Sequence, residues 1–297
     1  MSAGCDVRTE DVVYRKGQSG DLLARLYLPG GDGPFPAVVS VHGGRWVSQS
    51  RLTNEVIDAT LARAGIVVMA IDFRMPPAAK YPEPIADINF AIRWLKHMAG
   101  QLKSNECLVG GLGTSSGGHQ TMLNAMRPCD PRYFSMALPG SAANAELAYV
   151  VACWPVLDPL ARYAMAKQKN MERHIQSHDA YWPDEETMGE GNPQLILERG
   201  EPAFMPPALL IQGTGDKIVP PEMSRRFADA YQARGGSVTL RLFDGQPHTF
   251  ITKNPEIAAS REAIDLIASF VLEQAERIGS ARSAGTAAAA TAPPPHP

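Results

Sequence analysis

Residues Leu108–His119, L-V-G-G-L-G-T-S-S-G-G-H, contain the pattern on which the fold assignment depends. A short apolar run ends in glycines, and Ser115 stands at the centre of Gly113–Gly117, which has the form G-x-S-x-G. This pattern is typical of a nucleophile elbow, a sharp turn between a strand and a helix that presents a serine hydroxyl. Taken alone it is weak, because glycine and serine also fill ordinary loops. The surrounding sequence therefore has to support it.

Short apolar runs alternate with helical patterns on both sides of this stretch. Apolar runs such as Ala37–Val41, interrupted only by Ser40, and Ile66–Ile71 predict strands that are buried on both faces of a sheet. From Ile85, apolar residues recur at helical spacing and predict a helix with one buried face. Further strands are expected at Val12–Tyr14, Leu22–Leu28, Cys107–Gly110, Tyr149–Val156, Ala208–Gln212 and Ser237–Phe243. The last of these should lie nearer the edge of the sheet. Further helices are expected at Glu55–Ala64, Gly117–Ala125, Met223–Gly235 and Ile257–Ile278. This alternation predicts an α/β fold with a mostly parallel central sheet flanked by helices.

The length of 297 residues suits one large α/β domain, which we place at residues 1–278. A long polar insertion at about 160–201 carries Tyr163, Tyr181 and Trp182. An insertion of this length in a compact chain is often functional, so we expect a cap or lid whose aromatic side chains bind substrate together with Trp46. The alternative is that these aromatics only pack on the body. The Ala/Pro/Ser-rich residues 279–297 are expected to form a disordered tail.

Composition and charge exclude several classes of partner. The formal net charge of −3 offers no basic face for nucleic acid or anionic membrane. Residues 1–14 lack the apolar segment of a signal peptide, and no apolar run approaches the ~18 residues that span a membrane. The four cysteines are scattered without a C-x-x-C pair, which favours reduced thiols in a cytoplasmic protein. The final helix could form a homodimer surface, although a helix packed on the core would show the same pattern.

Four glycine-rich or polar stretches follow four of the predicted strands, namely His42–Trp46, Gly113–Gly117, Gly213–Asp216 and Gly245–His248. The carboxyl ends of parallel strands meet at one edge of a sheet, so these stretches should lie together. Ser115, Asp216 and His248 then form a set suited to nucleophilic catalysis. His248 takes the serine proton during attack on an acyl carbon, and Asp216 orients the imidazole. Asp158 and Asp244 are alternative acids, and His42 is the alternative histidine.

A negative charge that develops on the substrate oxygen requires N–H donors. The backbone of Ser116 should supply one, and the loop of Gly43, Gly44 and Arg45 should supply others. The Arg45 side chain has two interpretations. It binds a carboxylate or polar head of the substrate, or it pairs with a nearby acid such as Glu55 or Asp72.

The motifs together resemble those of α/β-hydrolases of the esterase/lipase group. They lean toward the branch that contains hormone-sensitive-lipase-like esterases, feruloyl-type esterases and kynurenine formamidase-like enzymes, over about Val12–Ile278. The motifs are H-G-G-R-W at 42–46, G-T-S-S-G-G-H at 113–119, G-T-G-D-K-I-V-P at 213–220 and G-Q-P-H-T-F at 245–250. The resemblance implies a carboxylesterase-type serine hydrolase that needs no cofactor and cleaves small-molecule esters with small or medium acyl groups. It also implies that His42 braces the oxyanion loop. Arg45 departs from the usual H-G-G-G pattern.

Two other functions fit the same residues. An amidase or arylformamidase could use the same three side chains, and a non-catalytic binding protein could keep the fold. A dehalogenase or epoxide hydrolase is disfavoured, because those resemblances require an aspartate at Ser115. His119, four residues after the serine, is expected to be structural. His174 and His178 share a helical spacing, but no H-E-x-x-H pattern accompanies them, so no metal site is expected.

Overall fold

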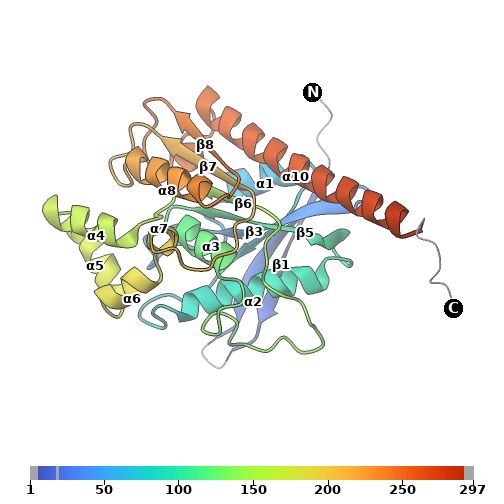
Figure 1. Ribbon diagram of the computed structural model, residues 1–297, viewed down its shortest axis with the longest axis horizontal. Coiled ribbons are helices and arrows are strands. Elements are labelled where there is room, and N and C mark those ends of the chain that lie inside the picture. Colours follow the sequence, from blue (N-terminus) through green and yellow to red (C-terminus); the bar gives the residue numbers. More distant parts are fainter. Residues whose placement is uncertain (1–5, 18–19, 291–297) are drawn as a thin grey trace.

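The computed structural model describes residues 6–17 and 20–290. Within these ranges eight strands form one sheet in the order β1-β2-β4-β3-β5-β6-β7-β8, at the centre of Figure 1. β1 pairs antiparallel with β2, and β2 pairs antiparallel with β4. All pairs from β4 to β8 are parallel. The strands are β1 (Val7–Arg15), β2 (Leu22–Pro29), β3 (Phe35–Val41), β4 (Val67–Ile71), β5 (Ser104–Thr114), β6 (Val150–Cys153), β7 (Ala208–Gly213) and β8 (Val238–Phe243).

The predicted mostly parallel sheet is therefore confirmed, with β8 at one edge as expected. The apolar runs of β3 and β4 are continuous because both faces of these strands are buried. In β3, Val38 packs on one face of the sheet while Val39 and Val41 pack on the other. The same alternation continues in β4, where Val68 and Met69 belong to opposite cores.

Helices cover both faces of the sheet (Figure 1). α1 (Glu55–Arg63) and α10 (Ala258–Ala290) contribute to the core on one face. α2 (Glu83–Met98), α3 (Ser116–Met126) and α8 (Pro221–Ala233) contribute to the core on the other. A four-residue helix, α9 (Phe250–Lys253), follows β8.

The insertion folds as four helices that project from one end of the sheet, at the left of Figure 1. They are α4 (Pro159–Gln168), α5 (Glu172–Tyr181), α6 (Glu185–Glu190) and α7 (Pro193–Glu198). Side-chain caps begin three of them, because the carboxylates of Asp158 and Asp184 and the amide of Asn192 accept backbone N–H groups at the first turns of α4, α6 and α7. The predicted insertion is thus an ordered helical segment.

The last helix differs from the expectation in two ways. α10 continues to Ala290, twelve or so positions past the point at which a disordered tail was predicted, because an alanine-rich sequence has high helix propensity. The remaining tail, 291–297, lies outside the described residues. The apolar face of α10 packs on the sheet through Ile264, Ile267 and Val271. The face that suggested a homodimer is therefore covered by the protein's own core, and the homodimer stays a prediction.

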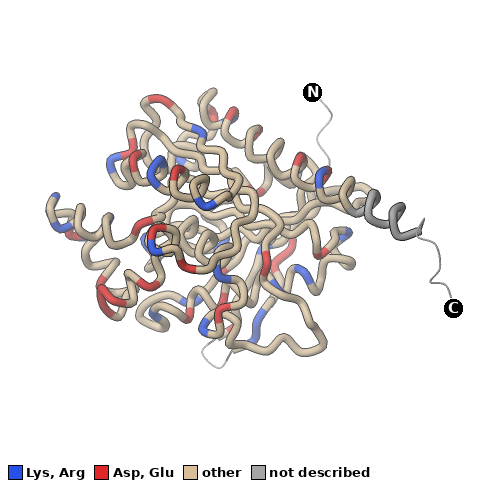
Figure 2. The backbone as a smooth tube through the Cα atoms, viewed as in Figure 1, with Lys and Arg blue, Asp and Glu red and all other residues tan. Residues whose placement is uncertain are grey.

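Acidic and basic residues are interspersed along the backbone (Figure 2). In the described part of the chain, no helix has both the length and the apolar character that crossing a membrane requires. Cys107, Cys129 and Cys153 are free thiols, and Cys5 lies outside the described residues.

Asp58 on α1 is an unusual feature of the core beneath the sheet. It is completely buried, and neither carboxylate oxygen has a hydrogen-bond partner among the described residues. Burial raises the pKa of Asp58 to about 8, although Ser40 opposes this shift. The folded protein therefore holds this carboxyl in its neutral form at pH values where an unfolded chain would ionise it.

We expect the stability of the protein to fall as the pH rises from about 4 to about 8 because of this group. The unfolded state releases the proton of Asp58 in this range and the folded state does not, so the slope approaches about 1.4 kcal/mol per pH unit. Asp58→Asn should make the free energy of unfolding less dependent on pH. Urea unfolding between about pH 5.5 and 8.5 measures this change. Asp229→Asn, at an exposed aspartate of α8, should follow the wild-type curve. The interpretation fails if Asp58→Asn follows it too.

Candidate active site

The turn between β5 and α3 holds Ser115 in a strained conformation. Its φ of +53° lies in the left-handed region, which is uncommon for residues other than glycine and costs on the order of 1 kcal/mol. The Ser115 N–H donates to the carbonyl of Cys153 on β6, 2.9 Å away. A Cβ on Gly113 would lie 2.4 Å from the carbonyl oxygen of Gly117. A Cβ on Gly117 would lie 2.3 Å from that of Val41, so both positions require glycine.

Ser115, His248 and Asp216 form one hydrogen-bonded chain at the carboxyl ends of β5, β7 and β8. Ser115 Oγ lies 3.0 Å from His248 Nε2, and His248 Nδ1 lies 2.7 Å from Asp216 Oδ2. A carboxylate only accepts, so Nδ1 carries the proton and Nε2 accepts from the serine hydroxyl. The other oxygen of Asp216 accepts the N–H groups of Ile218 and Val219, at 2.8 and 2.9 Å. These two bonds fix the carboxylate in the orientation that holds His248.

The alternative acids are committed elsewhere. Asp158 accepts from the N–H of Ala161 and pairs with Arg226 at 3.0 Å. Asp244 accepts a hydrogen bond from the hydroxyl of Thr214. Neither contacts a histidine among the described residues, so the structure brings only Asp216 to His248.

The other two histidines near the turn have structural contacts. His42 Nδ1 donates to the carbonyl of Gly43 at 2.7 Å, and its ring stacks on Phe73 with centroids 4.5 Å apart. His119 is fully buried, accepts from Trp46 Nε1 and donates to the carbonyl of Gly191. Burial lowers the pKa of His119 to about 4, so it stays neutral. Both rings therefore brace the loop and the turn, as predicted.

The H-G-G-R-W loop offers fewer free amides than its sequence suggests. The Gly43 N–H donates to Thr114 Oγ1 at 3.0 Å, and the Trp46 N–H donates to Ser116 Oγ at 3.1 Å. The N–H groups of Gly44 and Arg45 have no acceptor among the described residues. Ser116 is the first residue of α3, where an N–H has no partner inside the helix. Of the four predicted oxyanion residues, three thus present free amides and Gly43 instead joins the loop to β5.

A cavity of about 310 Å³ opens onto Ser115 and His248. Gly43, Gly44 and Arg45, the residues of the predicted oxyanion loop, line it. Residues that were not predicted also line it, above all His174 from α5, Trp154 after β6 and Lys253 from α9. The sequence shows the helical spacing of His174 and His178, but no local sequence pattern predicts that α5 contacts the cavity at Ser115. In the described residues no group of three or more His, Cys, Asp or Glu side chains could hold a metal ion.

The aromatic residues predicted to bind substrate do not line this cavity. Trp46, Tyr181 and Trp182 are at most 2% exposed and pack on one another, with the Trp46 and Tyr181 rings stacked 5.4 Å apart. Tyr163 donates to Asp179 on the outer part of the insertion. Tyr181 and Trp182 therefore join the cap to the body through Trp46, whereas Tyr163 joins α4 to α5 within the cap.

Arg45 pairs with neither Glu55 nor Asp72. Asp72 instead accepts two bonds from Arg51. Arg45 Nε donates to Ser177 Oγ of α5 at 3.3 Å, and Arg45 has no ion pair within the described part of the chain. Arg45 lines the catalytic cavity, and its side chain contacts the cap through Ser177.

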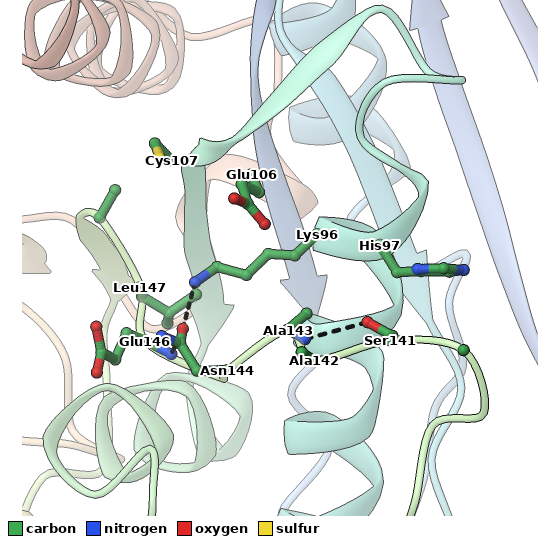
Figure 3. Close-up of a pocket in the computed structure, with 12 residues that line it drawn as sticks. Lys96, His97, Glu106, Cys107, Ser141, Ala142, Ala143, Asn144, Glu146 and Leu147 are labelled. Atoms are coloured by element: carbon green, nitrogen blue, oxygen red, sulfur yellow. Dashed lines mark hydrogen bonds between the residues drawn. The ribbon is translucent and has the colours of Figure 1, made fainter. Parts of the chain in front are cut away.

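A larger cavity, of about 650 Å³, lies elsewhere in the molecule (Figure 3). Lys96 and His97 of α2 and the 140–148 segment line it, and Lys96 Nζ donates to Asn144. It shares no residue with the cavity at Ser115 and contains no hydrogen-bonded nucleophile and base. We therefore assign the candidate active site to the smaller cavity.

The parallel sheet and the serine at the turn after β5 define an α/β-hydrolase fold. The chain belongs to the BD-FAE family, whose model matches residues 25–231.

Named relatives and solved structures agree with this assignment. The chain is 27% identical to the esterase LipC of Mycobacterium tuberculosis over 209 residues, which cover 67% of this chain and 49% of LipC. It resembles esterase Est2 of Thermogutta terrifontis with a TM-score of 0.70 and 25% identity, covering 91% of this chain and 92% of that one. It also resembles esterase B of Lactobacillus rhamnosis with a TM-score of 0.79 and 22% identity, covering 94% and 90%. The chain spans about half the length of the curated relatives that it matches.

We expect Gly117→Ala to destabilise the protein by about 1–3 kcal/mol, because the added methyl overlaps the carbonyls of Val41 and His42. Urea unfolding followed by circular dichroism measures the change. Gly100→Ala is the matched control, since a Cβ there meets no atom within 4 Å, and it should stay within about 0.5 kcal/mol of wild type. Equal stability of the two variants would contradict the crowding described at the turn.

Proposed function

We propose that this protein is a serine hydrolase that cleaves carboxylic esters with small or medium acyl groups. The hydrogen-bonded chain from Ser115 through His248 to Asp216 is the observation that carries the proposal. The family assignment and the esterase relatives support the choice of ester substrates.

In the proposed reaction His248 Nε2 takes the hydroxyl proton of Ser115 as Oγ attacks the acyl carbon. Asp216 stabilises the resulting imidazolium through the bond to Nδ1. His248 then gives the proton to the leaving alcohol, and an acyl-enzyme remains on Ser115. Water repeats the same steps to release the acid. The chain's own residues carry every one of these proton transfers.

The charge that develops on the acyl oxygen needs donors on the opposite side of Ser115 from His248. We assign this role to the N–H groups of Ser116, Gly44 and Arg45, which lack partners among the described residues. The φ of +109° at Gly44 supports the glycine requirement, and a Cβ there would lie 2.1 Å from the carbonyl oxygen of Ser48. A lost donor typically reduces kcat by about 10²–10³.

Ser115→Ala should lower kcat/KM on p-nitrophenyl butyrate by about 10⁶, because the nucleophile is removed while the fold is kept. Wild type and variant are assayed together on a parallel panel of aryl amides and formamides. Faster turnover of amides or formamides would replace the ester assignment with an amidase assignment. A folded wild type with no more activity than Ser115→Ala on any of them would favour a binding protein.

Asp216→Asn should lower kcat by about 10⁴, since the amide fails to hold the His248 tautomer that accepts the serine proton. Asp244→Asn is the matched control, because Asp244 follows the neighbouring strand and contacts Thr214 instead of His248. It should stay within a few-fold of wild type. A larger loss in Asp244→Asn than in Asp216→Asn would show that Asp244, and not Asp216, is the acid that orients His248.

A further inference from the structure

Positive side chains gather around the proposed catalytic serine. A second pocket of about 520 Å³ adjoins the catalytic cavity, and Arg45 lines both. Lys80 and Arg173 line the second pocket, and Lys253 lines the first. Neither set of lining residues, all of them in the described part of the chain, contains an aspartate or a glutamate. The chain as a whole carries a net charge of −3, and its acidic and basic residues are mixed (Figure 2). The positive surroundings are therefore local to the site.

A buried arginine stands beside this region. Arg162 of α4 is 2% exposed, and its guanidinium lies 5.7 Å from the ring centroid of Trp46. Its Nη1 is buried without a hydrogen-bond partner, and the side chain has no ion pair among the residues that the structure describes. Burial lowers the pKa of Arg162 to about 10, so the group is still positive at neutral pH. A buried charge without a partner is costly, and such groups are normally paired.

The acids near Arg162 already have partners. Asp158, one turn earlier on α4, caps its own helix and pairs with Arg226. Asp216 accepts from His248 and from two backbone amides. Arg45 and Arg162 thus lie close enough to repel each other electrostatically, and neither has a carboxylate partner among the described residues.

The backbone holds Arg45 in place for contact with a ligand. Arg45 and Trp46 are consecutive non-glycine residues in the left-handed region, with φ of +57° and +65°. Two such residues are strained and persist where the surrounding structure fixes them, commonly at functional sites. The bond from Nε to Ser177 then fixes the guanidinium at the boundary of the two pockets, with its Nη groups free of protein acceptors among the described residues.

We propose that the substrate is an ester that bears a carboxylate, and that Arg45 binds this carboxylate while Arg162 adds a buried positive charge behind it. The inference rests on the proposed esterase function and names its substrate class. A guanidinium binds a carboxylate through two parallel hydrogen bonds, which fix the orientation of the bound group as well as adding affinity. The anion would also balance the charge of Arg162.

The histidine that lines the cavity supports the positive character of the site. Burial, together with the positive charges of Arg162 and Arg45, lowers the pKa of His174 to about 4. His174 is therefore neutral at neutral pH, and it leaves the arginines as the binding groups for an anion.

The first experiment compares esters that differ only in charge. On the acyl side, mono-p-nitrophenyl glutarate is paired with p-nitrophenyl valerate, and on the alcohol side, p-acetoxybenzoate is paired with p-acetoxybenzamide. The uncatalysed hydrolysis of each ester is measured without protein and subtracted before kcat/KM is calculated. We expect the charged member of one pair to be favoured by about 10- to 100-fold, the factor of a hydrogen bond to a charged group. The favoured pair shows which end of the ester carries the carboxylate.

The readout for the variants is the charged-to-neutral ratio, since the Arg45 backbone also lies at the proposed oxyanion site. Arg45→Gln should lower this ratio by about tenfold or more. Arg162→Met, which keeps the volume of the side chain, should lower it in the same direction. Arg63→Gln, at an exposed arginine of α1, is the control and should keep the wild-type ratio. An unchanged ratio in Arg45→Gln would overturn the assignment of the anion to this residue.

A binding measurement separates this inference from the esterase proposal. Ser115→Ala protein is titrated calorimetrically with glutaric acid monoanilide against valeranilide, and with p-acetamidobenzoate against p-acetamidobenzamide. The anion site is supported if one charged amide binds more tightly than its neutral partner and the double variant Ser115→Ala/Arg45→Gln loses this difference. This result would stand even if no ester is hydrolysed. Equal binding of both members of both pairs overturns it. Hydrolysis of the neutral esters at least as fast as the charged ones overturns it too, and leaves the esterase proposal standing.

Discussion

Steric crowding between the loop after β3 and the turn after β5 is the constraint on which the site depends. The two segments are so close that a single added Cβ on either side would overlap a backbone carbonyl, as at Gly43 against Thr114 and at Gly117 against Val41. Hydrogen bonds then join the segments, from the Gly43 amide to Thr114 and from the Trp46 amide to Ser116. The strained φ of Ser115 is maintained because its neighbours on both sides are fixed in this way. The position of Ser115 and the positions of the free amides therefore both follow from the contact between these two segments.

The parallel sheet brings the other two polar groups to the same place. β5, β7 and β8 end at one edge, and the residues that follow them are Ser115, Asp216 and His248. Register between β7 and β8 places Gly213 opposite Phe243, so the two loops leave the sheet side by side. A Cβ on Gly213 would lie 2.1 Å from the carbonyl oxygen of Gln246, which shows how tightly these loops pack. The distance from Asp216 to His248 is therefore set by backbone packing more than by the two side chains.

Sequence was sufficient for the sheet and for the residues around the serine because short-range rules govern both. Buried parallel strands are apolar throughout, and the turn needs glycine at fixed offsets from Ser115. It was insufficient where long-range packing decides. Tyr181 and Trp182 are aromatic residues of the kind that often contact a substrate. In the structure they are buried against Trp46, which lies far from them in the chain. The cavity contact of His174 likewise depends on how α5 settles on the body, and no local pattern encodes that.

Packing of the cap links substrate recognition to the chemistry. Arg45 supplies a backbone amide beside Ser115 and a side chain that contacts Ser177 on α5. Trp46, the next residue, donates its backbone amide to Ser116 and stacks its ring on Tyr181 at the end of α5. Arg162 of α4 faces the same ring. A shift of α5 relative to the body would therefore move the loop that carries the free amides and the Arg45 side chain at the same time. The proposed binding of a substrate charge and the proposed stabilisation of the oxyanion would thus share one support, the pair Arg45–Trp46 in its strained left-handed conformation.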